Sequence, residues 1–256
     1  MKHRYIGLIT VRLSSSRLPQ KALLPIGPAR LIDHVIERAK LSLNHGLERV
    51  VVCTSTDAAD DVFVKIAQDH GVDHYRGSLK DKIDRWRGAA EHFGADYIIT
   101  IDGDDPFCDP ELVAAAIKQL EEKPMDVITA DHPDYVCGGF THGIATRVLQ
   151  KICAEKASDD TEMTKPYLFE SGLFEDGMLQ VDPVFKNNRV RLTLDYPEDY
   201  EFFQRVFAEM PISSNILPLR DILAFLDSRP DLVAINFFRQ NDFRQNQKKL
   251  ERLELK

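Results

Sequence analysis

Short runs of β-branched and other apolar residues alternate with longer amphipathic stretches through the first half of this chain. Short apolar runs predict strands, whereas apolar residues spaced three and four positions apart predict helices. The expected strands cover residues 5–11, 49–54, 72–75, 97–101 and 127–130, and the expected helices cover residues 31–42, 57–70, 80–93 and 109–120. Strands that alternate with helices form parallel sheets, because each helix carries the chain back across the sheet. The sequence therefore predicts an α/β fold with a mainly parallel central sheet flanked by helices.

The alternation weakens after residue 130. Helices are expected at residues 147–156, 161–169 and 197–209, and the remainder has a helical pattern with a basic tail. We therefore expect an α/β domain over residues 1–210 and a C-terminal helical extension over residues 211–256.

The charge balance limits the possible partners. The chain has 33 lysines and arginines against 41 aspartates and glutamates, a formal net charge of −8. Nucleic acids and anionic membranes bind broad positive surfaces, so this balance argues against both. No apolar run approaches the roughly 20 residues that cross a bilayer, and residues 1–5 lack the apolar core of a signal peptide. We therefore expect a cytoplasmic protein, in which any positively charged binding site occupies only a small part of the surface.

A basic segment follows the first expected strand, at the sheet edge where parallel strands end and ligands bind. Residues 12–21 hold three cations, Arg12, Arg17 and Lys21, together with three serines, Ser14–Ser16. Guanidinium groups grip phosphate oxygens in pairs and an ammonium group neutralises a terminal phosphate, so this composition suits a polyphosphate. The glycine spacing of a Walker A loop is absent from it. The alternative is a solvated loop whose cations pair with nearby acids.

Acidic residues follow two other expected strands. Asp102, Asp104 and Asp105 surround Gly103 after the fourth strand, and Asp195 follows a later extended segment. Carboxylates this close repel one another unless a cation neutralises them, and Mg²⁺ prefers carboxylate, water and phosphate oxygens. Asp104 and Asp195 are therefore the expected Mg²⁺ ligands. For Asp102 and Asp105 the alternative is a role in closing the turn.

Taken in order, these segments resemble those of the cytidylyltransferase family, which includes the CMP-3-deoxy-manno-octulosonate synthetases and the SpsF-like proteins of spore-coat polysaccharide synthesis. The resemblance is closest to the SpsF-like branch, and its segments are Ile9–Lys21, Thr54–Asp57 with Asp60 and Asp61, Arg76–Ser78, Gly103–Pro106 and Leu194–Asp199. It implies a glycosyltransferase-A-like nucleotidyltransferase fold. It also implies a homodimer that transfers CMP from CTP to a sugar acid or related anionic acceptor, with Mg²⁺ as cofactor and release of pyrophosphate.

The resemblance also implies roles for individual residues. Arg12, Ser15, Arg17 and Lys21 would hold the triphosphate, Asp104 and Asp195 would hold Mg²⁺, and the catalytic set would be Arg12, Arg17, Lys21 and Asp104. Arg76, Ser78 and Asp81 would border the nucleotide, and Arg85 would border the acceptor. The region after the fifth strand faces the acceptor in this family, which makes His142, Glu162, Thr164 and Lys165 the substrate-side candidates.

Departures from the family pattern keep two other function classes open. Gln20 stands where members commonly have a glycine before the loop lysine, and Arg30 is unexpected near the nucleotide. These departures suit a non-catalytic nucleotide-binding protein. Asp102-Gly103-Asp104 also matches the Asp-x-Asp metal motif of a glycosyltransferase that uses a nucleotide sugar.

Overall fold

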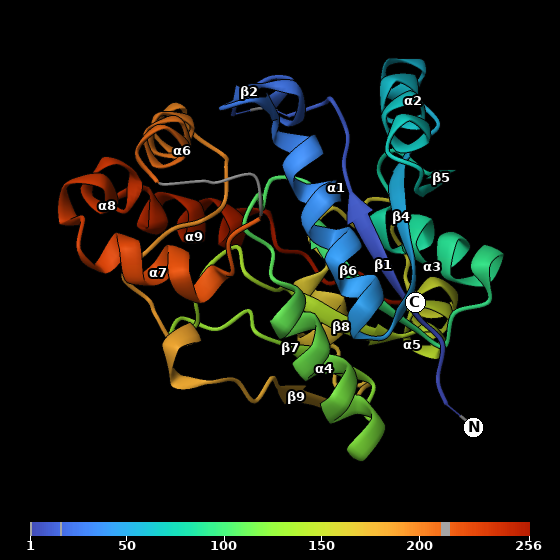
Figure 1. Ribbon diagram of the computed structural model, residues 1–256. Helices are drawn as coiled ribbons and strands as arrows, with labels where there is room; N and C mark the ends of the chain where they lie inside the picture. Colours follow the sequence, from blue (N-terminus) through green and yellow to red (C-terminus); the bar gives the residue numbers. More distant parts are fainter. Residues whose placement is uncertain (1, 16, 211–215) are drawn as a thin grey trace.

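The computed structural model describes residues 2–15, 17–210 and 216–256 (Figure 1). Ser16, one of the three loop serines, lies outside the described residues. Residues 211–215, with which the expected C-terminal extension begins, lie outside them as well.

Within the described residues, seven strands form the central sheet, in the order β5-β4-β1-β6-β8-β7-β9. The strands are β1 (Tyr5–Thr10), β4 (Leu47–Ser55), β5 (Asp73–Gly77), β6 (Tyr97–Asp102), β7 (Val127–Thr129), β8 (His142–Ala145) and β9 (Asp176–Met178). β1 pairs in parallel with β4 and β6, β4 with β5, and β7 with β9. β8 runs antiparallel to β6 and β7. The predicted mainly parallel sheet is confirmed, with β8 as its antiparallel member.

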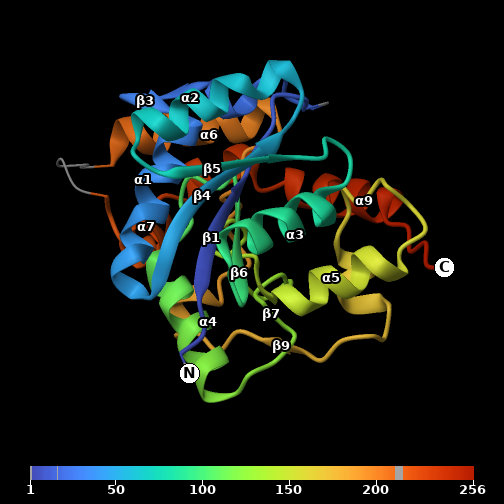
Figure 2. The same ribbon diagram turned by 90° about the vertical axis from the view of Figure 1, so that its right-hand side faces the viewer.

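Helices cover both faces of this sheet. They are α1 (Leu31–Leu41), α2 (Asp61–Asp69), α3 (Lys82–Phe93), α4 (Pro110–Glu122), α5 (Thr146–Glu155), α6 (Pro197–Glu209), α7 (Leu219–Asp227), α8 (Pro230–Asn236) and α9 (Arg239–Leu250). Figure 2 shows α1 and α4 on one side of the strands and α3 and α5 on the other. A small hairpin, β2 (Pro25–Ile26) with β3 (Ala29–Arg30), precedes α1. In the described part of the chain, no helix is both long and apolar enough to cross a bilayer.

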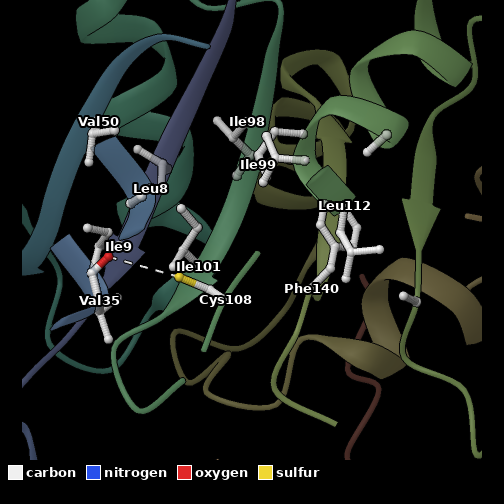
Figure 3. Packing of buried hydrophobic residues seen from close by; sticks show 14 of the residues in the cluster. Leu8, Ile9, Val35, Val50, Ile98, Ile99, Ile101, Cys108, Leu112 and Phe140 are labelled. Atoms are coloured by element: carbon white, nitrogen blue, oxygen red, sulfur yellow. Dashed lines mark hydrogen bonds between the residues drawn. The ribbon is translucent and has the colours of Figure 1, made fainter. Parts of the chain in front are cut away.

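The core lies between the sheet and these helices (Figure 3). Leu8 and Ile9 of β1 and Ile101 of β6 are buried with Val35 of α1 and Leu112 of α4. Burial on this scale stabilises the fold through apolar area removed from water, about 25 cal/mol per Å². β1 ends at Thr10 and β6 ends at Asp102, and the loops that follow them begin there.

One predicted helix is wrong. Residues 161–169 form only a single irregular turn, at Pro166–Glu170. Thr161 is used elsewhere, because its hydroxyl donates to Asp81 at 2.7 Å and accepts the N–H of Ile83 at 2.9 Å. Pro166 also lacks the backbone N–H that a helix starting at residue 161 would need at this position. Four strands were not expected: β2 and β3 of the small hairpin, and β8 and β9 of the central sheet. The two-part division at residue 210 stays a prediction.

Candidate active site

Three segments meet at the carboxyl ends of β1 and β6. These strands are neighbours, and the N–H of Gly103 donates to the carbonyl oxygen of Thr10 at 2.9 Å. A Cβ on Gly103 would lie 2.9 Å from that oxygen, which is closer than side chains approach in proteins, so this contact needs glycine. On the other side of the same turn, the N–H of Leu194 donates to the carbonyl oxygen of Asp104 at 2.9 Å. Asp104 and Asp195 therefore lie side by side although they are far apart in the sequence.

Lys21 joins the two carboxylates. Its Nζ contacts Oδ2 of Asp104 and lies 2.8 Å from Oδ1 of Asp195. Arg17 donates from Nη2 to the same Oδ1 of Asp195 at 2.5 Å. The side chain of Lys21 is 15% exposed and that of Asp195 is 2% exposed, so water screens these pairs less than it screens surface pairs. We call Arg17, Lys21, Asp104 and Asp195 the Lys21 cluster.

The Lys21 cluster shifts the pKa values of its members. Burial alone would raise the pKa of Asp195, but Lys21 and Arg17 outweigh it and hold that pKa well below its usual value. Burial also opposes the charge of Lys21, yet Asp104 and Asp195 raise the pKa of its ammonium group. Burial raises the pKa of Asp104 against the opposing effect of Lys21, and it raises the pKa of neighbouring Asp105 well above its usual value. Asp104 and Asp102 add to the effect of burial on the pKa of Asp105, so the turn brings several carboxylates close together.

The second oxygen of Asp195 faces an arginine that sequence reasoning missed. Arg191 is fully buried and donates from Nη2 to Oδ2 of Asp195 at 3.2 Å. No local charge pattern distinguishes Arg191 from Arg189, which is exposed two residues earlier. The burial of Arg191 depends on helices that follow much later in the chain.

Arg12, a predicted triphosphate ligand, connects two loops. Its Nη1 donates to the carbonyl oxygen of Leu79 at 3.1 Å, and its Nη2 lies 3.1 Å from Oε2 of Glu162. Glu162 is one of the substrate-side candidates. The ion pair therefore joins the predicted nucleotide side to the predicted acceptor side. Ser15, the other predicted ligand in this loop, donates its backbone N–H to the carbonyl oxygen of Leu13 at 2.9 Å.

The predicted nucleotide residues around α3 are engaged by protein groups. The hydroxyl of Ser78 accepts the N–H of Asp81 at 3.1 Å, and Arg85 donates to the carbonyl oxygen of Ser78. Asp81 accepts the N–H of Asp84 at 3.0 Å at the start of α3 and also binds Lys156. These contacts fix the shape of the loop between β5 and α3.

Arg76, at the end of β5, is held in a similar way. Its guanidinium donates to the carbonyl oxygens of Ser55 and Asp57, each at 2.9 Å, and lies 2.7 Å from Asp61. Arg76 therefore ties the loop after β4 to the end of β5.

Each of the remaining substrate-side candidates, His142, Thr164 and Lys165, contacts a different protein group. His142, on β8, is 4% exposed, and its Nδ1 lies 2.9 Å from the hydroxyl of Thr129. Burial lowers the pKa of His142 to about 4, so the ring is neutral near pH 7. Lys165 lies 3.9 Å from Asp131, and the carbonyl oxygen of Thr164 accepts the N–H of Tyr167 at 3.1 Å. Asp131 and Lys165 lie close enough for their charges to act on the His142 ring, but no hydrogen bond or ion pair between described residues joins His142 to Lys165 or Thr164.

The two departures from the family pattern have local explanations. Among the described residues, Gln20 is the one non-glycine residue with a positive φ, 56°, a left-handed conformation that glycine adopts without strain. Arg30 donates from Nε and Nη2 to the two oxygens of Asp33, each at 2.8 Å, at the start of α1. Arg30 is therefore held at the start of α1 and leaves the Lys21 cluster unchanged.

The carboxylate pair fits the donors that Mg²⁺ uses. Among the described residues, no three His, Cys, Asp or Glu side chains form a metal-binding group. Asp104 and Asp195 instead bind one cation together, the ammonium group of Lys21. Mg²⁺ takes one or two carboxylates from a protein and completes its shell with water and phosphate oxygens. Two carboxylates that already share a cation supply this donor set.

A family model and several known proteins are similar to this chain. A model of the cytidylyltransferase family matches residues 6–247. An uncharacterized protein of Methanocaldococcus jannaschii is 28% identical over 94% of this chain and 98% of its own length. The spore coat polysaccharide biosynthesis protein SpsF of Bacillus subtilis is 26% identical over 88% of this chain and 94% of its own length. A 3-deoxy-manno-octulosonate cytidylyltransferase of Mesorhizobium japonicum is 34% identical over 48% of this chain and 50% of its own length.

Solved structures share the fold. A cytidylyltransferase from Leptospira borgpetersenii superposes with a TM-score of 0.79 at 24% identity, covering 91% of this chain and 97% of that one. A CMP-2-keto-3-deoxy-manno-octonic acid synthetase in complex with CTP gives 0.59 at 19% identity, covering 80% and 99%. A Mycobacterium tuberculosis protein in complex with manganese gives 0.55 at 19% identity, covering 79% and 98%.

Proposed function

The chain belongs to the cytidylyltransferase family, and on this basis we propose that it transfers CMP from CTP to a sugar acid or related anionic acceptor. Pyrophosphate is released, and Mg²⁺ is the cofactor. The names of two relatives, a spore coat polysaccharide biosynthesis protein and a 3-deoxy-manno-octulosonate cytidylyltransferase, support an acceptor of this class. The family resemblance also supports a homodimer in the cytoplasm.

The observation that carries this proposal is the Lys21 cluster. Its two cations come from the loop after β1, and its two carboxylates come from the turns at residues 104 and 195. Positive groups next to paired carboxylates are what a nucleoside triphosphate and its metal require, because the cations bind phosphate and the carboxylates bind the metal. With CTP and Mg²⁺ bound, Asp104 and Asp195 would hold the metal, and Lys21 and Arg17 would be available to phosphate oxygens.

In the proposed reaction, an acceptor oxygen attacks the α-phosphorus of CTP in line with the bond to pyrophosphate. The new oxygen–phosphorus bond forms as that bond breaks, and the acceptor proton passes to solvent or to a group on the acceptor side. Arg12, Arg17 and Lys21 neutralise the charge that grows on the departing pyrophosphate. Bound Mg²⁺ would supply further charge neutralisation at the phosphate oxygens. The protein provides positioning and electrostatics, so the reaction needs no protein nucleophile.

A pyrophosphate-release assay tests the proposal. The four nucleoside triphosphates are combined with a panel of sugar acids, with Mg²⁺ and with EDTA. We expect release with CTP and one class of sugar acid, dependent on Mg²⁺ and lost in Asp104→Asn. Asp73→Asn, which changes a carboxylate paired with Arg49 at the surface, is the matched control and keeps the activity.

Two outcomes would overturn the proposal. Release of a nucleoside diphosphate from a nucleotide sugar, without pyrophosphate from CTP, would assign a glycosyltransferase. Binding of CTP with Mg²⁺ and no turnover of any acceptor would assign a non-catalytic nucleotide-binding protein.

A further inference from the structure

A buried polar network lies behind Asp195, on the side away from Lys21. Arg191 donates from Nε to Oδ1 of Asp199 at 2.9 Å and from Nη2 to Oδ2 of Asp199 at 3.0 Å. The same Nη2 donates to Oδ2 of Asp195 at 3.2 Å. Oδ2 of Asp199 also accepts the backbone N–H of Asp195 at 2.8 Å. Arg191 and Asp199 therefore hold both the backbone and one carboxylate oxygen of Asp195.

Two side chains from the C-terminal helices complete this network. Asn236, the last residue of α8, is fully buried and donates from Nδ2 to Oδ1 of Asp199 at 2.9 Å and to the carbonyl oxygen of Arg191 at 3.0 Å. Gln240, in the first turn of α9, accepts from Nη1 of Arg191 at 3.0 Å. Figure 1 shows α8 and α9 beside α6, the helix that carries Asp199.

An aromatic ring of α9 covers the same guanidinium. The Cζ atom of Arg191 lies 4.7 Å from the ring centroid of Phe243, and that of Arg17 lies 5.9 Å from it. Both distances are within the range of cation–π attraction. One helix of the C-terminal region therefore contacts the arginine behind Asp195 and an arginine of the Lys21 cluster in front of it.

The arrangement divides the two oxygens of Asp195 between two tasks. Oδ2 is bound by Arg191, whereas Oδ1 faces Lys21 and Arg17. A buried arginine is costly unless its N–H groups are paired, and its orientation is then set by its partners. Asn236 and Gln240 are such partners. Without them, Arg191 would keep its charge but lose part of the framework that fixes its direction.

We propose that Asn236 and Gln240 are positioning residues for Asp195, so that α8 and α9 are part of the metal site. This inference rests on the proposed function, in which Asp195 is a Mg²⁺ ligand. Partners that hydrogen-bond a metal ligand directly typically change metal affinity or activity by about 10–100-fold when they are lost. Asn236 and Gln240 act one step further away, through Asp199 and Arg191, so we expect the lower end of that range.

Gln240→Ala is the first test variant, because Gln240 is only half-buried and its truncation removes less packing than truncation of the fully buried Asn236. Calorimetry measures the affinity for CTP in EDTA and at increasing Mg²⁺, on protein shown to be folded by circular dichroism. For the wild-type chain, we expect affinity to rise with Mg²⁺. Gln240→Ala should need about 10-fold more Mg²⁺ for the same rise and should bind CTP in EDTA as the wild type does. Gln240→Glu keeps an acceptor for Arg191 and should recover most of the response.

Asn236 provides an independent test, because one of its variants introduces a negative charge instead of only removing a hydrogen bond. Asn236→Asp replaces a donor with a carboxylate that faces Asp199, so it should raise the Mg²⁺ requirement at least as much as Asn236→Ala. Gln245→Ala and Asn241→Ala change the same residue types at exposed positions of α9 and are the matched controls.

The outcomes separate the two proposals. If CTP affinity of the wild-type chain does not respond to Mg²⁺, the metal role of Asp195 fails, and this inference fails with it. If the wild type responds, and folded Gln240→Ala and Asn236→Ala respond equally, then the proposed function stands and the positioning role is overturned. A lower melting temperature with an unchanged Mg²⁺ response would also overturn the positioning role, since it indicates a purely structural network.

Discussion

The proposed nucleotide side and the proposed acceptor side of this site are built in different ways. On the nucleotide side, the Lys21 cluster brings opposite charges from three remote segments into direct contact. On the acceptor side, His142 is neutral and hydrogen-bonded to its neighbouring strand, and Lys165 has only a distant ion pair with Asp131. Closely paired charges point to a kind of chemistry, because phosphate groups and metal ions bind groups of opposite charge. Charges on the proposed acceptor side are less closely paired, so they say less about the acceptor.

The largest expected effect comes from breaking the nucleotide side. Lys21→Ala removes the cation shared by Asp104 and Asp195, and we expect kcat for pyrophosphate release to fall about 10²-fold, as for the loss of one preorganised charge donor. Asp195 keeps Arg17 and Arg191 as partners, so the variant should remain folded. Lys65→Ala, on the exposed face of α2, is the control. Activity near that of the wild type would show that the Lys21 cluster is not the catalytic centre.

A smaller effect tests the neutrality of the acceptor side. Burial lowers the pKa of His142 to about 4, whereas an unfolded histidine titrates near 6.5. Between these values the unfolded chain binds more protons, so this residue destabilises the fold as pH falls. His142→Gln removes that penalty, and its free energy of unfolding should gain about 2 kcal/mol relative to the wild type between pH 7 and pH 5.

Urea unfolding of both proteins at the two pH values measures this difference. His45→Gln removes an exposed histidine and is the matched control. Parallel pH dependences of His142→Gln and the wild type would contradict a neutral His142.

The smallest effect is expected where the two sides meet. Glu162 pairs with Arg12 at 3.1 Å, and the pair is partly exposed. Glu162→Gln frees Arg12 for phosphate, and because such pairs contribute about 0.2–1 kcal/mol, affinity for CTP should rise by up to about fivefold. Calorimetry with CTP measures it, and Glu155→Gln at an exposed position of α5 is the control. Weaker binding would instead mean that Glu162 orients Arg12 toward the nucleotide.

The first half of the fold could be predicted mainly because β1, β4 and β6 are buried on both faces. Residues 50–53 are apolar at four successive positions, which is typical of a central parallel strand, and β4 lies there. β8 and β9 could not be predicted, because each is short and both contain glycine. Their pairing depends on strands already in place. The turn at Pro166 was mistaken for a helix because tertiary contacts of Thr161 leave no mark in the sequence.

The residues of the candidate site also fall into a group that the sequence predicts and a group that it does not. Arg17, Lys21 and Asp104 could be singled out because they lie in the segments after β1 and β6, and the ends of parallel strands meet at one edge. Asp195 was found because it follows an extended segment, although residues 190–194 form only an isolated bridge at Arg191 and no strand of the sheet. Arg191 could not, because its burial depends on Asn236 and Gln240, which a search of strand ends does not reach. Local patterns therefore identify the groups that face the ligand, whereas the groups that hold them require the assembled fold.

The left-handed backbone at Gln20 has a practical consequence for transplanting this loop. A side chain in that conformation costs roughly 1–2 kcal/mol, which the surrounding protein must offset. In a synthetic peptide of residues 12–21, Gln20 would leave this conformation in water. The cations would then no longer be held in one arrangement. Anyone grafting the loop onto another scaffold would do better with glycine at that position.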